Sequence, residues 1–159
     1  MIIMGIDPGL ARLGYGVIRK PKVKGEKFKA LDYDCIETSP DLSVGERLKK
    51  ISDEVENLIK KYKPELICVE NIYFFKNLKT AMPVSQAKGV ILLAAAKKKI
   101  RVLEVSPLEV KMTLVGYGRA DKKQVQKMVE RLVVLTKKTI KLDDTADALG
   151  NAVCGALKG

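Results

Sequence analysis

The run Ile2-Ile3-Met4-Gly5-Ile6-Asp7-Pro8-Gly9 sets the architecture of this chain of 159 residues. It is typical of a buried strand that ends in a turn, because mostly apolar residues are followed by Asp-Pro-Gly. A second apolar run, Leu66-Ile67-Cys68-Val69, ends in the same way at Glu70. Sites in open α/β sheets collect at the carboxyl ends of strands. Asp7 and Glu70 are therefore predicted to meet at one edge of a sheet.

Each of these acids also has a simpler interpretation. Asp7 suits a plain turn, and Glu70 suits a strand that surfaces at its end. Asp144 and Asp147 add a third position, since their spacing of three residues puts both on one face of the last predicted helix. Helix N-termini attract acids as caps, which accounts for Asp143 or Asp144 better than for Asp147.

Clustered carboxylates repel one another, so a site built from these acids needs cations, and hard oxygen ligands select Mg²⁺ or Mn²⁺. The chain as a whole is basic, with 30 Lys and Arg against 19 Asp and Glu and a net charge of +11. This excess favours a polyanionic partner such as nucleic acid, although surplus lysine also keeps a small protein in solution. An acidic spot on a basic protein indicates a metal-dependent enzyme that acts on a polyanion.

The residue types exclude several classes of protein. There is no histidine, which rules out a Ser-His-Asp triad and leaves acid–base chemistry to carboxylate, lysine, tyrosine, cysteine or bound water. Cys35, Cys68 and Cys154 are far apart and are expected to be buried thiols in a reducing compartment. No apolar run reaches membrane-spanning length, so we expect a cytoplasmic protein. The length and the apolar content of 47% suit one domain, residues 1–159.

The predicted elements begin with strands and then alternate. Strands are expected at residues 1–7, 15–19, 27–38, 66–70 and 101–105. Helices are expected between Ser43 and Pro64 and at residues 80–98, 107–115, 121–135 and 144–157. This order predicts an α/β fold, a mixed sheet with helices on both faces. The helix over 80–98 is apolar nearly all round at Val90–Ala96, which suggests that a second subunit supplies part of its cover.

Two further segments suggest contacts with nucleic acid. Lys122 and Lys123 begin a helix after Gly116-Tyr117-Gly118-Arg119, an arrangement that suits a phosphate site made of amides and lysine or simply a solvated lysine-rich face. Tyr73-Phe74-Phe75-Lys76 follows Glu70 closely. Aromatic residues beside lysine suit stacking on unpaired bases, or they anchor the loop to the core.

These residues together resemble the RuvC family, the bacterial Holliday junction resolvases. The resemblance spans nearly the whole chain, in the right order. It rests on the segments 4–9 (MGIDPG), 14–18 (GYGVI), 69–77 (VENIYFFKN), 86–90 (QAKGV), 110–116 (VKMTLVG), 120–125 (ADKKQV) and 144–149 (DTADAL).

The resemblance implies a ribonuclease H-like fold whose five-stranded mixed sheet has its first three strands antiparallel and helices on both faces. It implies a homodimer that resolves four-way DNA junctions by paired nicks in opposing strands, in DNA recombination and repair. The helix around Val90–Ala96 is our candidate for the dimer interface. The resemblance also suggests that a branch-migration helicase complex works alongside the enzyme.

The resemblance further implies roles for single residues. Asp7, Glu70, Asp144 and Asp147 match the catalytic set, which we expect to hold two Mg²⁺ ions, with Mn²⁺ able to substitute. The family's lysines near the scissile phosphate match Lys111 and Lys122. Tyr73 matches an aromatic residue that engages bases near the crossover. The remaining residues that we expect to contact DNA are Phe74, Lys76, Arg119 and Lys123.

Three other functions compete with junction cleavage. One is an RNA-processing nuclease with the same acidic cluster. Another is a phosphate-binding domain of the actin or sugar-kinase type, which also carries an acid and glycines in its first hairpin, although such proteins pair two domains. The third is a basic binding protein without catalysis, in which the acids only cap helices and end strands.

Overall fold

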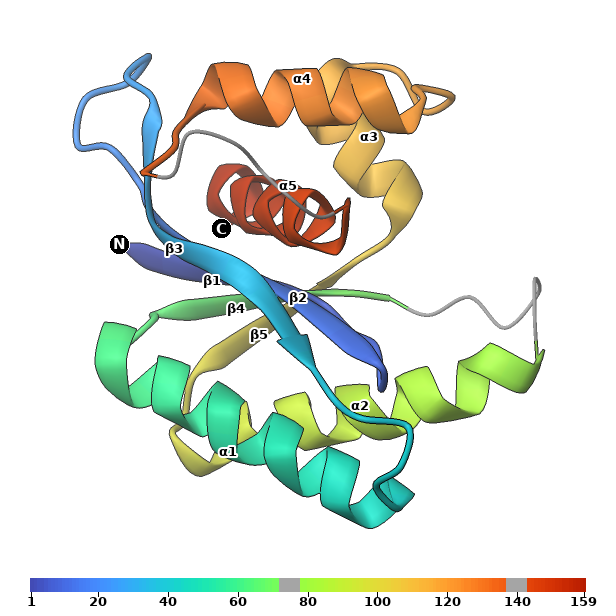
Figure 1. The fold of residues 1–159 in the computed structure, drawn as a ribbon. Coiled ribbons are helices and arrows are strands. Elements are labelled where there is room, and N and C mark those ends of the chain that lie inside the picture. Colours follow the sequence, from blue (N-terminus) through green and yellow to red (C-terminus); the bar gives the residue numbers. More distant parts are fainter. Residues whose placement is uncertain (72–77, 137–142) are drawn as a thin grey trace.

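The computed structural model describes residues 1–71, 78–136 and 143–159 (Figure 1). Its strands are β1 (Ile2–Asp7), β2 (Arg12–Arg19), β3 (Phe28–Glu37), β4 (Leu66–Glu70), β5 (Arg101–Val105) and β6 (Val133–Val134). Its helices are α1 (Val44–Tyr62), α2 (Leu78–Lys97), α3 (Pro107–Val115), α4 (Lys122–Leu132) and α5 (Asp143–Lys158). The ranges predicted for β4, β5 and α3 are confirmed.

The strands form one mixed sheet in the order β5-β4-β1-β2-β3-β6. The first three strands pair antiparallel, whereas β4 lies parallel to both β1 and β5. The predicted mixed α/β sheet is thus confirmed, but the count of five strands was too low by one. The extra strand, β6, pairs with the start of β3. The helix predicted over 121–135 ends earlier because Val133, its C-cap, has extended backbone dihedrals, which β-branched residues favour.

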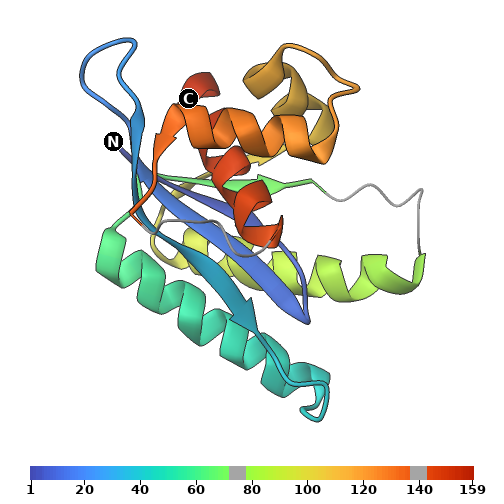
Figure 2. The same cartoon turned by 45° about the horizontal axis from the view of Figure 1, so that its top comes forward.

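Helices cover both faces of this sheet (Figures 1 and 2). On one face lie α1 and α2; on the other lies α5, with α3 and α4 packed over it. Because α5 is enclosed between the sheet and two helices, its residues from Thr145 to Ala156 are buried with the exception of Asp147. The burial ends after Ala156, since Leu157 is 53% exposed.

The ends of the first two helices follow from local sequence. At the start of α1 a capping box forms, with the Ser43 hydroxyl accepting from the Glu46 amide and the Glu46 carboxylate accepting from the Ser43 amide. The helix ends at Lys63, which adopts a left-handed conformation before Pro64. The second helix, α2, begins before the predicted residue 80, so Pro83 lies inside it and not in its first turn.

Across the described ranges, no helix combines the length and the hydropathy that a membrane span requires.

Candidate active site

Strand alternation brings Asp7 and Glu70 to the same face of the sheet. In β1, Met4 and Ile6 pack toward α1 and α2, so Asp7 faces α5. In β4, Leu66 and Cys68 pack in the core on the α5 side, and Glu70 continues that series. These two strands are parallel neighbours. Both carboxylates therefore stand at carboxyl ends of adjacent strands, beneath the N-terminal part of α5.

Two glycines allow α5 to lie directly on this part of the sheet. A Cβ atom at Gly5 would stand 2.0 Å from the carbonyl oxygen of Ala148, and one at Gly14 would stand 2.1 Å from that of Asp144. Gly14 is also the residue that pairs with Asp7 across the hairpin. Any side chain at either glycine would push the helix away. Gly5 and Gly14 thus serve the close packing of backbone against backbone.

The first turns of α5 bring two acids to the same place, each turned toward a cation. The Asp147 carboxylate lies 3.0 Å from Nζ of Lys122, and the Asp144 carboxylate lies 3.0 Å from Nε of Arg12. The side chain of Asp143 is 71% exposed and lies 3.5 Å from Nζ of Lys122, at the rim. Asp144, with a side chain only 24% exposed, is the more enclosed of the two neighbouring acids.

Electrostatics link the four predicted carboxylates. Burial, followed by the charges of Glu70, Asp147 and Asp144, raises the pKa of Asp7 from 3.8 to about 8. Burial and the charge of Asp147 also raise the pKa of Glu70. A hydrogen bond between Asp7 and Glu70 raises the pKa of Asp7 and lowers that of Glu70. These acids lie close enough to oppose one another's ionisation.

Lys122 lies beside this acidic group and pairs with Asp147. Burial raises the pKa of Asp147, and its hydrogen bond with Lys122 counteracts that rise. Burial lowers the pKa of Lys122, but the hydrogen bond and charge of Asp147 outweigh it, so the net shift is upward. Lys122 is therefore held as a cation beside the acids.

A cleft of about 220 Å³ opens at this point. Acids, lysines, one amide and apolar side chains line it: Glu70, Pro107, Val110, Lys111, Lys122, Val125, Asp147 and Asn151. The predicted lysines Lys111 and Lys122 thus share a concave surface with two of the predicted acids. An anionic group entering the cleft would meet both lysines, whereas a cation would meet the carboxylates.

The residues present suit divalent cations by the chemistry of their donors. All four candidate ligands are carboxylates, the ligand type preferred by Mg²⁺ and Mn²⁺. The Oδ2 atom of Asp144 is buried and accepts no hydrogen bond. Nε of Arg12 lies within ion-pair distance of it, so Arg12 supplies positive charge but not an aligned hydrogen bond. Within the described ranges, no three acidic or thiol side chains already form a complete ligand set, since Asp147 and Asp144 are turned toward Lys122 and Arg12.

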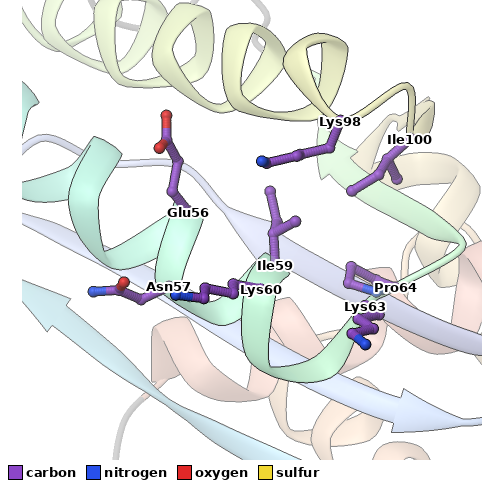
Figure 3. A pocket seen from close by; sticks show the side chains of 8 residues that line it. All are labelled: Glu56, Asn57, Ile59, Lys60, Lys63, Pro64, Lys98 and Ile100. Carbon is purple, nitrogen blue, oxygen red and sulfur yellow. The ribbon is translucent and has the colours of Figure 1, made fainter.

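A larger hollow, of about 440 Å³, lies at the opposite edge of the sheet (Figure 3). It is found between the ends of α1 and α2, where β4 and β5 begin. Its lining consists of Glu56, Asn57, Ile59, Lys60, Lys63, Pro64, Lys98 and Ile100. It contains one carboxylate and lies at strand amino ends, so it lacks both the acid cluster and the position typical of α/β active sites.

The remaining predicted residues lie around the cleft or outside the described ranges. Arg119 and Lys123 are exposed and do not line the cleft. Tyr73, Phe74 and Lys76 fall in the segment 72–77, outside the described residues.

The predicted use of the α4 amides for phosphate is not supported. The Asp121 carboxylate accepts from the Gln124 amide, and the Gln124 side chain accepts from the Asp121 amide. This capping box places a negative charge where a phosphate would bind, so Lys122 contributes to the cleft through its side chain alone.

The sequence prediction missed two residues of the site. Asn151 is 2% exposed, lines the cleft and donates from Nδ2 to the carbonyl oxygen of Ile6 at 3.0 Å. Its position, four residues after Asp147 in an otherwise apolar helix, is a signal that could have identified it. Arg12, which pairs with Asp144, carried no comparable signal, because only the fold brings the hairpin beside α5.

Comparison with known proteins identifies the family of this chain. The family model described as Crossover junction endodeoxyribonuclease RuvC matches residues 3–155. A protein of that name from Alkaliphilus metalliredigens is 48% identical over 159 residues, which are 100% of this chain and 94% of the relative. Another from Ruminiclostridium cellulolyticum is 49% identical over 154 residues, or 97% and 90%. A solved structure of T. thermophilus RuvC in complex with Holliday junction substrate has a TM-score of 0.91 at 34% identity, covering 99% of this chain and 94% of that one.

Proposed function

This chain belongs to the RuvC family of crossover junction endodeoxyribonucleases, and from that premise we propose that it cuts DNA in the cleft between Asp7, Glu70, Asp147 and the two cleft lysines. It is a Holliday junction resolvase that acts in DNA recombination and repair. The reaction is the hydrolysis of phosphodiester bonds in two opposing strands of a four-way junction.

One observation carries the assignment of the site. Asp7 is mostly buried, and burial, followed by the charges of Glu70, Asp147 and Asp144, raises its pKa to about 8. Keeping so many carboxylates together costs free energy unless cations neutralise them. A site that only capped a helix or ended a strand would not need acids from β1, β4 and α5 at one point. We therefore assign Asp7, Glu70, Asp144 and Asp147 as the residues that would hold the divalent ions.

The chain's own residues have separable tasks in this reaction. The four carboxylates would hold divalent ions, which would supply an activated water and stabilise the departing 3′-oxygen. Lys111 and Lys122 line the same cleft, where their charges offset the negative charge that develops on the phosphate. Lys122 pairs with Asp147, and a cation held by that carboxylate would leave the lysine available to the phosphate.

The surface around the cleft suits a polyanionic substrate. The net charge of +11 and the exposed Arg119 and Lys123 beside the lysine-lined cleft support binding through phosphates. Affinity should therefore fall steeply as the salt concentration rises. The roles of Tyr73, Phe74 and Lys76 at the crossover stay predictions from the sequence.

We propose a homodimer whose interface is an exposed stripe on α2. One side of this helix is buried in the core through Ala87, Ile91, Ala94 and Ala95. The other side leaves residues exposed at alternating steps of four and three, namely Met82, Gln86, Gly89, Leu93 and Ala96. Met82 is 66% exposed and Leu93 is 56% exposed. Such spacing forms a continuous seam along a helix. A symmetric pairing of two copies would suit a junction with near two-fold symmetry.

The proposal also includes magnesium as the working ion, manganese as a substitute, and the cytoplasm as the compartment. Three free cysteines, Cys35, Cys68 and Cys154, are consistent with a reducing compartment. The helicase partner implied by the family resemblance stays a prediction.

A cleavage assay with matched variants tests the proposed function. The purified chain is offered an immobile four-way DNA junction, the corresponding duplex and a structured RNA, each with Mg²⁺ or with EDTA. We expect symmetric nicks in the junction only, and only with Mg²⁺. Asp7→Asn should abolish cleavage while junction binding in EDTA persists. Asp41→Asn, which removes the same charge from an exposed loop residue, should cleave like the wild type.

Two outcomes would contradict this assignment. Preferred cleavage of the structured RNA would favour the RNA-processing alternative on the same fold. Equal loss of cleavage in Asp7→Asn and Asp41→Asn would mean that total charge matters and the carboxylate site does not. A calorimetric titration with Mn²⁺ in the absence of nucleic acid adds an independent readout, because Asp7→Asn should weaken the binding of that ion.

A further inference from the structure

Lys88 is a charged side chain in the interior of the molecule, with the residue only 9% exposed. It lies in α2 between Ala87 and Ile91, which belong to the core beneath the sheet. Its Nζ donates to Oδ1 of Asn71 at 3.0 Å and also to the Glu104 carboxylate. An enclosed ammonium needs such partners, so Lys88 joins α2 to the ends of β4 and β5.

The partners of Lys88 lie directly behind the acidic site. Asn71 is the residue that follows Glu70, and its amide donates to the carbonyl oxygen of Val105 at 2.7 Å. Successive side chains along an extended segment point to opposite faces of a sheet. Glu70 accordingly points toward α5 and the cleft, whereas the side-chain amide of Asn71 contacts Lys88 on the side of α2. Holding Asn71 on one face thus fixes the direction of Glu70 on the other.

We propose that Lys88 is a positioning residue for the nuclease site, acting through Asn71 to aim Glu70 into the cleft. This inference rests on the proposed function, because it concerns the orientation of one of its assigned ligands. Glu70 is the last residue of β4 and pairs with Val105, and the backbone bond from the Asn71 amide to the Val105 carbonyl holds the segment just beyond it. The Lys88–Asn71 contact adds support from the opposite face.

Loss of Lys88 should slow cleavage while it leaves the stability of the fold nearly unchanged. Removing one partner of an ion pair is costly for stability when it leaves the other charge buried and unpaired. Glu104 has a side chain 43% exposed and would remain hydrated if Lys88 were lost. Lys88→Met should therefore leave folding nearly intact but release Asn71. Catalysis depends on placement within a fraction of an ångström, so we expect the single-turnover cleavage rate to fall roughly tenfold to hundredfold.

The test compares rate, binding and local order in four variants of the full chain. For Lys88→Met we expect a slower single-turnover rate, an unchanged Kd for the junction in EDTA, and faster hydrogen exchange at the Asn71 amide. Lys88→Arg, which keeps the charge and the donors, should recover most of the rate. Asn71→Ala should slow cleavage similarly, and its combination with Lys88→Met should add little, because both changes break one contact.

A matched control and a second route keep the result decisive. Lys97→Met removes an exposed lysine of the same helix, whose Nζ lies 3.1 Å from Glu56, and should change none of the three readouts. If Lys88→Met does not fold, Glu104→Gln weakens the other contact that holds Lys88 in place, from its exposed partner, and should also slow cleavage. Wild-type rates in Lys88→Met, or parallel losses of rate, junction binding and stability, would overturn the positioning role. A wild-type protein that cuts no junction would instead overturn the proposed function, and the positioning role with it.

Discussion

Asn151 donates from Nδ2 to the carbonyl oxygen of Ile6 at 3.0 Å, one residue before Asp7. This bond joins α5, which carries Asp144 and Asp147, to the strand that carries Asp7. Asn151 is 2% exposed, so the bond is shielded from water. It fixes how far α5 can slide along β1, and therefore how far apart the acids of the two elements stand.

Replacing this amide should weaken both folding and cleavage. Asn151→Ala leaves the carbonyl of Ile6 without its side-chain partner, and we expect a loss of about 1–3 kcal/mol in the free energy of unfolding. Urea denaturation measures this loss, and the junction assay should show a slower rate at saturating Mg²⁺. Asn57→Ala changes an exposed amide on α1 and should alter neither quantity. Equal stability of the two variants would argue against the coupling of α5 to β1.

A methyl group at Gly14 should displace α5 without touching any ligand. Its Cβ would stand 2.1 Å from the carbonyl oxygen of Asp144, so the helix must move. We expect Gly14→Ala to lower the melting temperature and to reduce cleavage strongly. Gly45→Ala is the control, because a Cβ at this residue of α1 meets nothing within 4 Å. Wild-type cleavage by Gly14→Ala would contradict the close packing of α5 on the hairpin.

The stability of the metal-free protein should fall as the pH rises from about 4 to about 8. The pKa of Asp7 is 3.8 ordinarily and about 8 in the fold, so within this window the folded state keeps a proton that the unfolded chain has lost. The favourable contribution is complete below 3.8 and is lost as the pH passes through about 8. Asp7→Asn should flatten this dependence, as measured by urea denaturation in EDTA across the window. Parallel curves for the two proteins would contradict the raised pKa.

Lys122 and Lys123 are adjacent but should behave differently. Lys122 lines the cleft and pairs with Asp147, so Lys122→Gln should lower the cleavage rate of bound junction about 10²-fold or more. Lys123 is exposed, and Lys123→Gln should mainly weaken junction binding and reduce its salt dependence. Single-turnover rates and fluorescence anisotropy at several salt concentrations separate the two effects. Similar behaviour of both variants would mean that the cleft lysine only binds substrate.

A charge in the exposed stripe of α2 should break the proposed dimer. Leu93 is 56% exposed on this stripe, while Leu157 is 53% exposed near the end of α5. Leu93→Glu should therefore yield a monomer in analytical ultracentrifugation, because a charge is costly in an apolar interface. Leu157→Glu should sediment like the wild type. A wild-type protein that is already monomeric at micromolar concentration would remove the interface.

Local sequence was enough to predict most helices and strands and the four candidate acids of the site. The apolar runs before Asp7 and Glu70 specify strands, because their side chains must be buried on both faces. The Ser43–Glu46 spacing specifies the start of α1 through hydrogen bonds among neighbouring residues. Such features depend on residues a few positions apart. The strand β6 was not predictable in this way, since Val133 and Val134 form a strand only by pairing with β3.

Contacts between distant segments account for the remainder of the site. Three contacts exist only in the folded molecule, where α5 packs on the glycines of the first hairpin. They join Arg12 to Asp144, Lys88 to Asn71, and Asn151 to Ile6. The pKa of Asp7 changes for the same reason, because burial and neighbouring charge are properties of the packed molecule. Spacing along a chain specifies which residues share a face, whereas distances across the fold depend on packing that no short segment contains.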